Sequence, residues 1–284
     1  MSFVERQIDV TIKYYKTGET MKLSGHRVLL EMVAIAGIHS GQVAMRIYGL
    51  PLHVIREFIA ISPIAAQGIS KNSILIEAGN AGETLHTVFS GAIMHSWADF
   101  SNPPDVSLVI NASVMIQAAL TPAPPVSWKG PISAATVMQT FAAAQGWAFS
   151  NLGVNVMLQN PAFNGSLQDQ MESCAQQAGI SYTVNQNGVL IIYPKGKPPS
   201  QPNEVMPIIS PSAGMVGYPM LTNKGVNVRS IFLPGVHNGS AFAIEGSQFP
   251  EANRIWHAHT VAHTLESQVP NGAWFTDLQG FASE

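Results

Sequence analysis

Apolar and polar positions alternate along the N-terminal part of the chain with the two-residue period of a half-buried β-strand. Residues 6–16 show it clearly, with Ile8, Val10, Ile12 and Tyr14 at every second position. The same pattern predicts strands at residues 27–35, 41–48, 72–78, 84–95 and 106–113. Together they predict a six- or seven-stranded barrel or sandwich.

Turn-forming residues separate these strands. The connections are expected at Thr17-Gly18-Glu19, residues 37–41, Gly79-Asn80-Ala81-Gly82 and Asn102-Pro103-Pro104-Asp105. After Pro51, apolar residues repeat at helical spacing over residues 52–61. Because proline suits the first turn of a helix, one short helix is expected there, ending before Pro63.

In the middle of the chain the period becomes helical. Helices are predicted at residues 134–145 and 167–178, behind the N-cap residues Ser133 and Ser166 and before Gly146 and Gly179. A hairpin is expected after each helix, formed by residues 148–150 with 154–158 and by residues 181–185 with 189–193. The order helix, glycine, hairpin therefore occurs twice and predicts a small α/β module.

Two proline-rich segments, residues 121–125 and 195–203, flank this module and favour extended spacers. Beyond the second, strands are expected at residues 220–233, 240–245, 254–266 and 274–282, with Pro270-Asn271-Gly272 as a tight turn. The predicted fold class is mainly β with an α+β insertion. The predicted domains are a barrel-like β domain with one helix (1–122), an α/β module of two helix-hairpin units (123–198) and a β domain (199–284).

The composition adds an expectation about assembly. Charged residues are only 11% of the chain, against roughly a quarter in ordinary soluble proteins. Few charges leave little to keep copies apart, so contact with partners or with other copies explains this composition better than a free monomer does. A large buried core is the competing explanation.

The net charge and the start of the sequence indicate which classes of protein are not expected. The net charge is −3 without a basic tract, so specific nucleic-acid binding is not indicated and any DNA nearby is expected only in transit. The start of the sequence has no signal-peptide pattern, and no run of about 18 apolar residues occurs. We expect a soluble, unexported chain without a membrane-spanning segment. The single cysteine, Cys174, excludes an internal disulfide and a multi-cysteine zinc site, and a buried, inert thiol is expected.

The strongest candidate for chemistry is the histidine group His257, His259 and His263. On a regular strand all three project from one face, and His257 with His259 has the spacing to share a metal ion. His263 is about 13 Å from His259 by the usual strand rise, too far to join them. A complete site would need Glu266, His237 or another copy of the chain, so polar wall or interface histidines are the preferred interpretation and no metal is predicted.

Other enzyme signatures are missing from the sequence. Gly-Asn-Ala-Gly and Gly-Met-Val-Gly lack the residue order of a phosphate-binding loop, and no Gly-x-Ser-x-Gly or His-Glu-x-x-His occurs. The scattered acids are interpreted as caps and solvated positions: Asp99, Asp105, Asp169, Glu172 and Asp277. The tryptophans are interpreted as single core or interface anchors, with carbohydrate stacking as the alternative: Trp97, Trp128, Trp147, Trp256 and Trp274. No catalytic residue and no cofactor is predicted.

Six further segments of the chain are Arg-Ile-Tyr-Gly-Leu (46–50), Gly-Ala-Ile-Met-His-Ser-Trp-Ala-Asp-Phe (91–100), Ser-Cys-Ala-Gln-Gln-Ala-Gly-Ile (173–180), Leu-Ile-Ile-Tyr-Pro-Lys-Gly (190–196), Ile-Ser-Pro-Ser-Ala-Gly-Met-Val-Gly-Tyr-Pro (209–219) and Asn-Gly-Ala-Trp-Phe-Thr (271–276). With these segments the chain resembles the small baseplate hub proteins of contractile-tailed bacteriophages and prophages. None is a catalytic fingerprint. The resemblance rests on their order and spacing over nearly the whole chain.

The resemblance implies two tail-tube-like β domains in each of three subunits, which form a pseudo-sixfold ring between tail tube and spike. It also implies contacts with other baseplate proteins, and a channel for the tape measure protein and for DNA during ejection. The expected location is the baseplate of the virion tail, after synthesis in the host cytoplasm. The alternative is a tail-associated enzyme that degrades peptidoglycan, with the acids or the histidine strand as its site.

Overall fold

The structure is a computed structural model that describes residues 4–35, 41–59, 71–197 and 205–282. Three expectations lie wholly or partly outside these residues. They are the connection at residues 37–41, the end of the first helix at residues 60–61 and most of the second proline-rich segment.

Every strand predicted in the N-terminal part is present in the structure. The strands are β1 (Arg6–Lys13), β2 (Thr20–Leu23), β3 (Val28–Ile35), β4 (Gln42–Tyr48), β5 (Ser73–Asn80), β6 (His86–Asp99) and β7 (Ser107–Ser113). The short helix α1 (Leu52–Glu57) begins after Pro51 as expected. The four-residue strand β2 was not predicted, because the sequence after the turn at Gly18 is too short to show a period; its pairing with β1 defines it.

The C-terminal part differs from the prediction at one strand. Its elements are β15 (Ile208–Ile209), β16 (Met215–Thr222), β17 (Gly225–Ile231), β18 (Ala241–Ile244), the 3-10 helix η1 (Pro250–Ala252), β19 (Ile255–Glu266) and β20 (Trp274–Phe281). The single strand expected at residues 220–233 is wrong, since a turn at residues 223–224 splits it into the antiparallel pair β16–β17. Gly225 makes this pairing possible: its φ is +129°, and a Cβ there would lie 1.9 Å from the Gly280 carbonyl oxygen.

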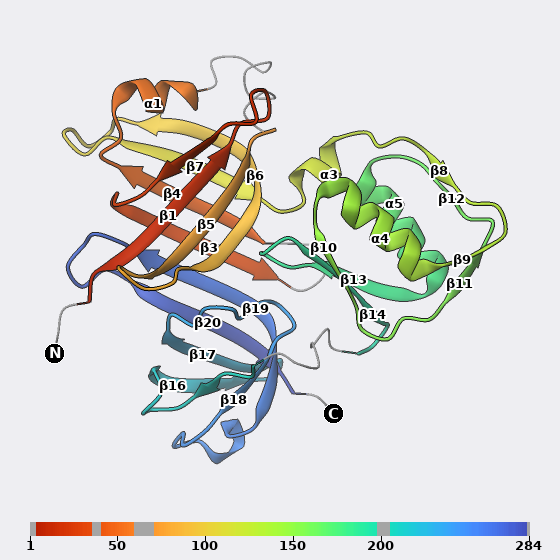
Figure 1. Cartoon of the computed structure of the whole chain (residues 1–284). Helices are drawn as coiled ribbons and strands as arrows, with labels where there is room; N and C mark the ends of the chain where they lie inside the picture. Colours follow the sequence, from red (N-terminus) through yellow and green to blue (C-terminus); the bar gives the residue numbers. More distant parts are fainter. Residues whose placement is uncertain (1–3, 36–40, 60–70, 198–204, 283–284) are drawn as a thin grey trace.

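The two β parts share one hydrogen-bonded sheet. Its main path runs β16-β17-β20-β19-β3-β4-β7-β6-β5-β1-β2, and β3 joins β19 over seven residue pairs. In Figure 1 the red-to-yellow strands and the blue strands follow one another across this junction. Among the described residues no strand pairing connects the two ends of the path, so the closed-barrel form of the fold stays a prediction, as does the division at residues 122 and 198.

The middle of the chain forms a separate lobe beside the sheet (Figure 1). Its elements are α3 (Ile116–Leu120), β8 (Val126–Ser127), β9 (Pro131–Ser133), α4 (Ala134–Gln145), β10 (Ala148–Asn151), β11 (Met157–Gln159), β12 (Ala162–Phe163), α5 (Leu167–Ala178), β13 (Ile180–Val184) and β14 (Val189–Pro194). Both long helices have the predicted bounds. Ser133 and Ser166 cap them, and Gly146 and Gly179 end them in the left-handed conformation.

Only one of the two predicted hairpins forms. The pair β13–β14 is antiparallel as expected. The hairpin of residues 148–150 with 154–158 is wrong, because β10 pairs in parallel with β14 and β11 pairs with β9. The Asn151 side chain explains the change of direction: its amide donates to the Val154 carbonyl and its oxygen accepts from the Val154 N–H, which turns the chain away from β10.

The buried residues form two apolar clusters. The larger cluster joins the N-terminal strands to the α/β lobe, and within the lobe Trp128, Phe141 and Phe163 meet edge to face with centroids 5.9 to 6.5 Å apart. The smaller cluster lies under the C-terminal strands. Cys174 is fully buried, as expected, and burial raises the pKa of its thiol to about 12, which disfavours the reactive thiolate. The fold class, mainly β with few helices, is confirmed.

Candidate assembly surface

Eight consecutive strands of the sheet, from β16 to β6, have one side that faces away from the apolar clusters, and this side is exposed at positions on β16, β17, β3 and β4. The strand register fixes this face: Val216, Arg229, Asp277, Ala262 and Val33 lie opposite one another across β16, β17, β20, β19 and β3. The alternate residues of the same strands point to the apolar clusters. We call the solvent-facing side of these eight strands the eight-strand face.

The same registers show which side chains lie on this face over β3, β4, β7 and β6. Glu31, Ala44, Asn111 and His95 are cross-strand neighbours there. The registers therefore connect this side from the C-terminal β part to the N-terminal one, although on β7 Ser107, Val109 and Ser113 are buried.

Charge on the eight-strand face is nearly balanced. The eight strands carry Arg46, Arg229, Glu31, Asp99, Glu266 and Asp277 and no lysine. Arg229 binds Asp277 through two hydrogen bonds of 2.7 and 2.9 Å, and Arg46 binds Asp99 at 2.5 Å. Glu266 accepts from Arg27, which directly precedes β3, at 3.2 Å.

Hydrogen bonds also control the ionisation of Asp99. The hydroxyl and the backbone N–H of Ser101, followed by Arg46, lower its pKa to about 2. The carboxylate therefore stays charged at neutral pH and stays paired. Of the face's charged side chains, only Glu31 has no ion pair among the residues that the structure describes.

One end of the face is the apolar edge strand β16. Its side chains Val216, Tyr218, Met220 and Leu221 are all exposed, Tyr218 to 65% and Met220 to 59%. Phe249 packs edge to face on Tyr218 with a centroid distance of 6.3 Å. An exposed, apolar strand at a sheet edge favours association with another chain.

The other end of the face is the second half of β6. This strand is long: residues 86–92 pair with β5, while residues 92–99 pair with β7. In the described part of the chain, no strand therefore lies on the other side of residues 94–99, which we call the β6 edge. Its face carries Trp97, which is 44% exposed, and Phe100 follows at 51%.

The edge strand β2, at the far end of the sheet path, has a different character. It has four residues, and its exposed Lys22 forms a 2.8 Å ion pair with the buried carboxylate of Asp9. Short length and an outward lysine both disfavour pairing with another chain. The apolar edges are therefore β16 and the β6 edge.

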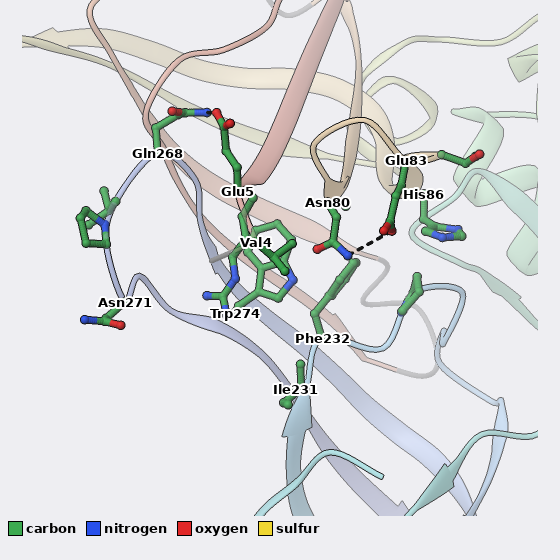
Figure 2. A pocket seen from close by; sticks show the side chains of 16 residues that line it. Val4, Glu5, Asn80, Glu83, His86, Ile231, Phe232, Gln268, Asn271 and Trp274 are labelled. Atoms are coloured by element: carbon green, nitrogen blue, oxygen red, sulfur yellow. Dashed lines mark hydrogen bonds between the residues drawn. The ribbon is translucent and has the colours of Figure 1, made fainter. Parts of the chain in front are cut away.

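Figure 2 shows a groove of about 820 Å³ beside the junction of the two β parts. Its floor is Trp274, which meets Phe232 edge to face at 5.4 Å and carries the Arg6 guanidinium at 5.3 Å. Arg6 also donates to the Gly272 carbonyl at 2.7 Å, and Gln268 donates to Glu5 at 2.7 Å. These contacts fasten the N-terminal strand to the β19–β20 turn.

The three histidines of β19 do not share one face, so that expectation is wrong. A bulge leaves His259 without a partner in β20, because Ala258 pairs with Gly280 and Thr260 with Gln279. This extra residue reverses the alternation. His257 and His259 keep the outer side, while His263 is buried against Phe232 and Thr276.

Burial dominates the ionisation of these rings. It lowers the pKa of His257, and it lowers the pKa of His263 to about 4 despite the opposing effect of the Asp277 charge. His237, a potential third ligand, is buried in a loop with its Nδ1 3.0 Å from the Asn238 carbonyl oxygen. Within the described ranges no three His, Cys, Asp or Glu side chains form a group suited to a metal ion.

The remaining candidate residues are dispersed. Asp169 lies in the capping box of α5 and Glu172 accepts from Gln176 at 3.4 Å, whereas Asp99 and Asp277 belong to the ion pairs of the face. Asp105 is exposed in the turn before β7. Of the tryptophans, Trp256 and Trp274 are buried, Trp128 belongs to the lobe core, Trp147 is half-buried and Trp97 is exposed.

The α/β lobe is fixed to both β parts by polar contacts. The side-chain amide of Gln186 donates to the Val236 carbonyl at 2.7 Å. The backbone carbonyl of Gln186 accepts from the Ser90 N–H at 2.7 Å. Asn238 donates to Thr183 at 3.1 Å and to the Ile35 carbonyl at 3.3 Å. A Cβ at Gly41 would lie 2.8 Å from the Gln186 Cβ, so only glycine permits this approach.

No helix in the described ranges is long and apolar enough to cross a membrane. The sequence matches the family model "Baseplate hub gp41" over residues 60–271. The chain belongs to this baseplate hub family, and its role is that of a structural hub in a virion tail.

Solved structures show the same fold at low identity. A tail protein from Neisseria meningitidis MC58 superposes with a TM-score of 0.57 at 10% identity, over 97% of this chain and 96% of that one. The 43 kDa tail protein of prophage MuSo2 from Shewanella oneidensis gives 0.57 at 9% identity, over 96% of both chains. The type VI secretion component c3393 of E. coli gives 0.53 at 9% identity, over 100% of this chain and 75% of that one. No curated protein sequence matches the chain.

Sequence reasoning recognised the family but did not find the surface. The sequence of β16, Met-Val-Gly-Tyr-Pro-Met-Leu-Thr, did contain a signal. Apolar residues occur at both odd and even positions, whereas a strand with one solvated side alternates apolar and polar residues. The β6 edge had no such signal. Its exposure depends on where β5 stops pairing, which only the tertiary structure determines.

Proposed function

We propose that three copies of this chain form a closed ring that joins the tail tube to the spike. The eight-strand face carries the proposal. It spans both β parts, and its path divides into the four strands β16-β17-β20-β19 and the four strands β3-β4-β7-β6. Three copies supply six such groups, which suits a threefold ring that contacts a sixfold tube.

The chemistry of the face suits the lining of a channel. Its three arginines, with Arg27 included, and four acids give 3 − 4 = −1 for the face of one copy. A surface without lysine and with paired arginines has little attraction for phosphate groups. We propose that the tape measure protein and then DNA pass along this face during ejection without being held.

The remaining partners follow from the position of such a ring. They are the tail tube protein on one side, the spike protein on the other and further baseplate proteins around it. The type VI component c3393 is described as similar to the tail proteins gp27 and gp5 of bacteriophage T4, and its shared fold supports this placement. We further propose synthesis in the host cytoplasm, three domains at residues 1–122, 123–198 and 199–284, and no cofactor.

Assembly tests the proposal directly. Light scattering of the purified chain, alone and mixed with its tail tube and spike proteins, should show a trimer, and negative-stain images should show annular particles. A chain that stays monomeric at every concentration and with both proteins present contradicts the ring.

We propose that the protein has no catalytic activity and no catalytic residue. A zymogram on peptidoglycan should show no clearing by the wild-type chain. Clearing that disappears in His257→Ala or Asp105→Ala would establish an enzyme instead.

A further inference from the structure

We infer that Asn164 is a site of spontaneous covalent modification, at which the side-chain amide is hydrolysed to give aspartate and isoaspartate. Asn164 and Gly165 belong to the connection between β12 and α5, in the α/β lobe (Figure 1). The inference goes beyond the proposed ring and does not depend on it. It rests on the hydrogen bonds and the exposure of the four Asn-Gly pairs in the sequence.

An asparagine that precedes a glycine reacts with its own backbone. Hydroxide removes the proton of the glycine N–H, and the nitrogen attacks the asparagine Cγ. The side-chain nitrogen takes a proton from water and leaves as ammonia, so a cyclic imide forms. Water then opens the imide at either carbonyl, and the sum of all steps is amide plus water giving carboxylate plus ammonium. Glycine favours ring closure because it has no Cβ to obstruct it.

The four pairs differ in the state of the glycine N–H and of the asparagine side chain. They are Asn164-Gly165, Asn187-Gly188, Asn238-Gly239 and Asn271-Gly272. A glycine N–H that donates a hydrogen bond must release it before its nitrogen attacks. The asparagine side chain must also turn toward that nitrogen. The pair with neither restraint should react first.

At three of the four pairs the glycine N–H donates a hydrogen bond to a backbone carbonyl. The donors and distances are Gly188 at 3.1 Å, Gly239 at 2.7 Å and Gly272 at 3.2 Å. All three glycines are buried. Hydroxide therefore reaches their nitrogens only when the chain opens locally.

Asn164-Gly165 differs from the other pairs in each respect. Both of its residues are exposed. Within the part of the chain that the structure describes, neither the Gly165 N–H nor the Asn164 side-chain amide has a hydrogen-bond partner. The Asn238 amide, by contrast, donates to Thr183 and to the Ile35 carbonyl. Reaction at Asn164 therefore requires no hydrogen bond to be broken.

One charge opposes the reaction at this site. A Cβ added at Gly165 would lie 2.8 Å from Asp169 Oδ2, so this carboxylate lies beside the glycine and disfavours an anion on its nitrogen. Asp169 is exposed, however, and it accepts bonds from the Ser166 hydroxyl at 2.7 Å and from the Ser166 N–H at 2.9 Å. Because solvent and salt screen an exposed charge, the unbonded glycine N–H determines the order of the four sites.

Isoaspartate at position 164 alters the lobe, since both neighbouring residues are fixed. Phe163 is buried and pairs with Val126 of β8, while the Gly165 carbonyl accepts from the Ala123 N–H at 3.3 Å. Isoaspartate adds a carbon atom to the main chain between these two contacts. The Ala123 N–H should therefore lose its protection from hydrogen exchange in the modified chain.

The test follows the four asparagines in the purified full chain during incubation in mildly alkaline buffer at physiological temperature. Peptide mass mapping detects the conversion of amide to acid, and an isoaspartate methyltransferase labels the isoaspartate. Asn271 is the appropriate comparison because it is also exposed. Asn164 should convert about tenfold faster than Asn271, because a hydrogen bond of ordinary strength must open first at Gly272.

Unfolding and substitution provide the controls. In concentrated urea the four sites should convert at similar rates, since each has the same Asn-Gly sequence. Asn164→Gln should remove the first acidic form seen in ion-exchange chromatography, because glutamine must close a larger ring. The matched control is Asn271→Gly, which suits the φ of +56° at that position and should leave the first acidic form unchanged.

Faster conversion at Asn164 in the folded chain, together with similar rates in urea, supports the inference. Conversion of Asn271 as fast as that of Asn164 in the folded chain contradicts it. An Asn164 that stays unmodified while the chain in urea converts also contradicts it. Ring formation is measured on unmodified chain, so the proposed function succeeds or fails separately.

Discussion

At the scale of single residues, His263 connects the histidine-rich strand to the core. The ring is packed at 5.3 Å from Phe232, and its Nδ1 lies 2.9 Å from the Thr276 hydroxyl, which also accepts from the Leu233 N–H. The Thr276 proton is therefore available to Nδ1, and the ring is stabilised in its neutral form. Burial lowers the pKa of the ring to about 4, although the charge of Asp277 opposes this shift.

This shift predicts a loss of stability in mild acid. The unfolded chain binds a proton below its ordinary pKa of 6.5, whereas the folded chain binds it only near 4. Stability from His263 is thus complete above pH 6.5 and decreases as the pH falls to 4, by up to about 3 kcal/mol. Urea unfolding of wild type and His263→Gln between pH 7.5 and 4 should show a steeper decrease for the wild type. Equal pH dependence of the two proteins contradicts the assignment.

At the scale of elements, the capping of α5 shows how local sequence fixes a helix. The Ser166 hydroxyl accepts from the Asp169 N–H at 3.2 Å, and the Asp169 carboxylate accepts from the Ser166 N–H at 2.9 Å. At the start of α4 the Ser133 hydroxyl accepts from the Ala135 N–H, without a reciprocal bond to the Ser133 N–H. The Ser166 hydroxyl, which also donates to the Asp169 carboxylate at 2.7 Å, and then the Ser166 N–H lower the pKa of Asp169.

Removing this cap should destabilise the protein measurably. Ser166→Ala should lower the free energy of unfolding by about 1 kcal/mol and raise the pKa of Asp169. Ser133→Ala, as the matched control with a single bond, should have the smaller effect. Chemical denaturation gives the first quantity and NMR titration of the Asp169 carboxyl gives the second. An unchanged pKa in Ser166→Ala, which retains the backbone N–H, contradicts the bond from the Ser166 hydroxyl to the carboxylate.

At the scale of the whole molecule, three parts of the chain meet at Gln186 and Asn238. The side chain of Gln186 reaches Val236, its backbone reaches Ser90, and Asn238 connects Ile35 with Thr183. All these bonds are remote in sequence, and the Gln186 and Asn238 side chains are buried. They set the position of the α/β lobe relative to the sheet.

Loss of the Gln186 side-chain contact should weaken the packing of the α/β lobe against the sheet. Gln186→Ala leaves the buried Val236 carbonyl without its donor, which costs about 1 to 3 kcal/mol. We expect faster hydrogen exchange in β13, β14 and the segment around Val236, with the far strands β1 and β5 unchanged. Gln176→Ala on the exposed side of α5 is the control and should exchange like the wild type. Unchanged exchange in Gln186→Ala contradicts a docking role.

The sequence predicted local structure well where neighbouring residues alone determine it. The helices at residues 134–145 and 167–178 were predicted to the residue because an N-cap serine, an apolar stripe and a glycine agree at each. Predictions failed where pairing partners decided the outcome, as for β10, whose residues pair in parallel with residues 41 positions later instead of with a hairpin partner. The prediction that the three histidines of β19 share one face failed for the same reason, since the bulge at His259 is defined only by the pairing with β20.

The sequence by itself determined the family, the predominance of β-structure and the low charge that favours assembly, because these depend on composition, period and the order of short segments. The tertiary structure alone decided that the two β parts share one sheet, which strand residues point away from the apolar clusters, and which edges have no strand partner among the described residues. The physical reason is that strand pairing joins residues far apart in the chain. Burial and exposure of a strand residue therefore depend on neighbours that its local sequence does not specify.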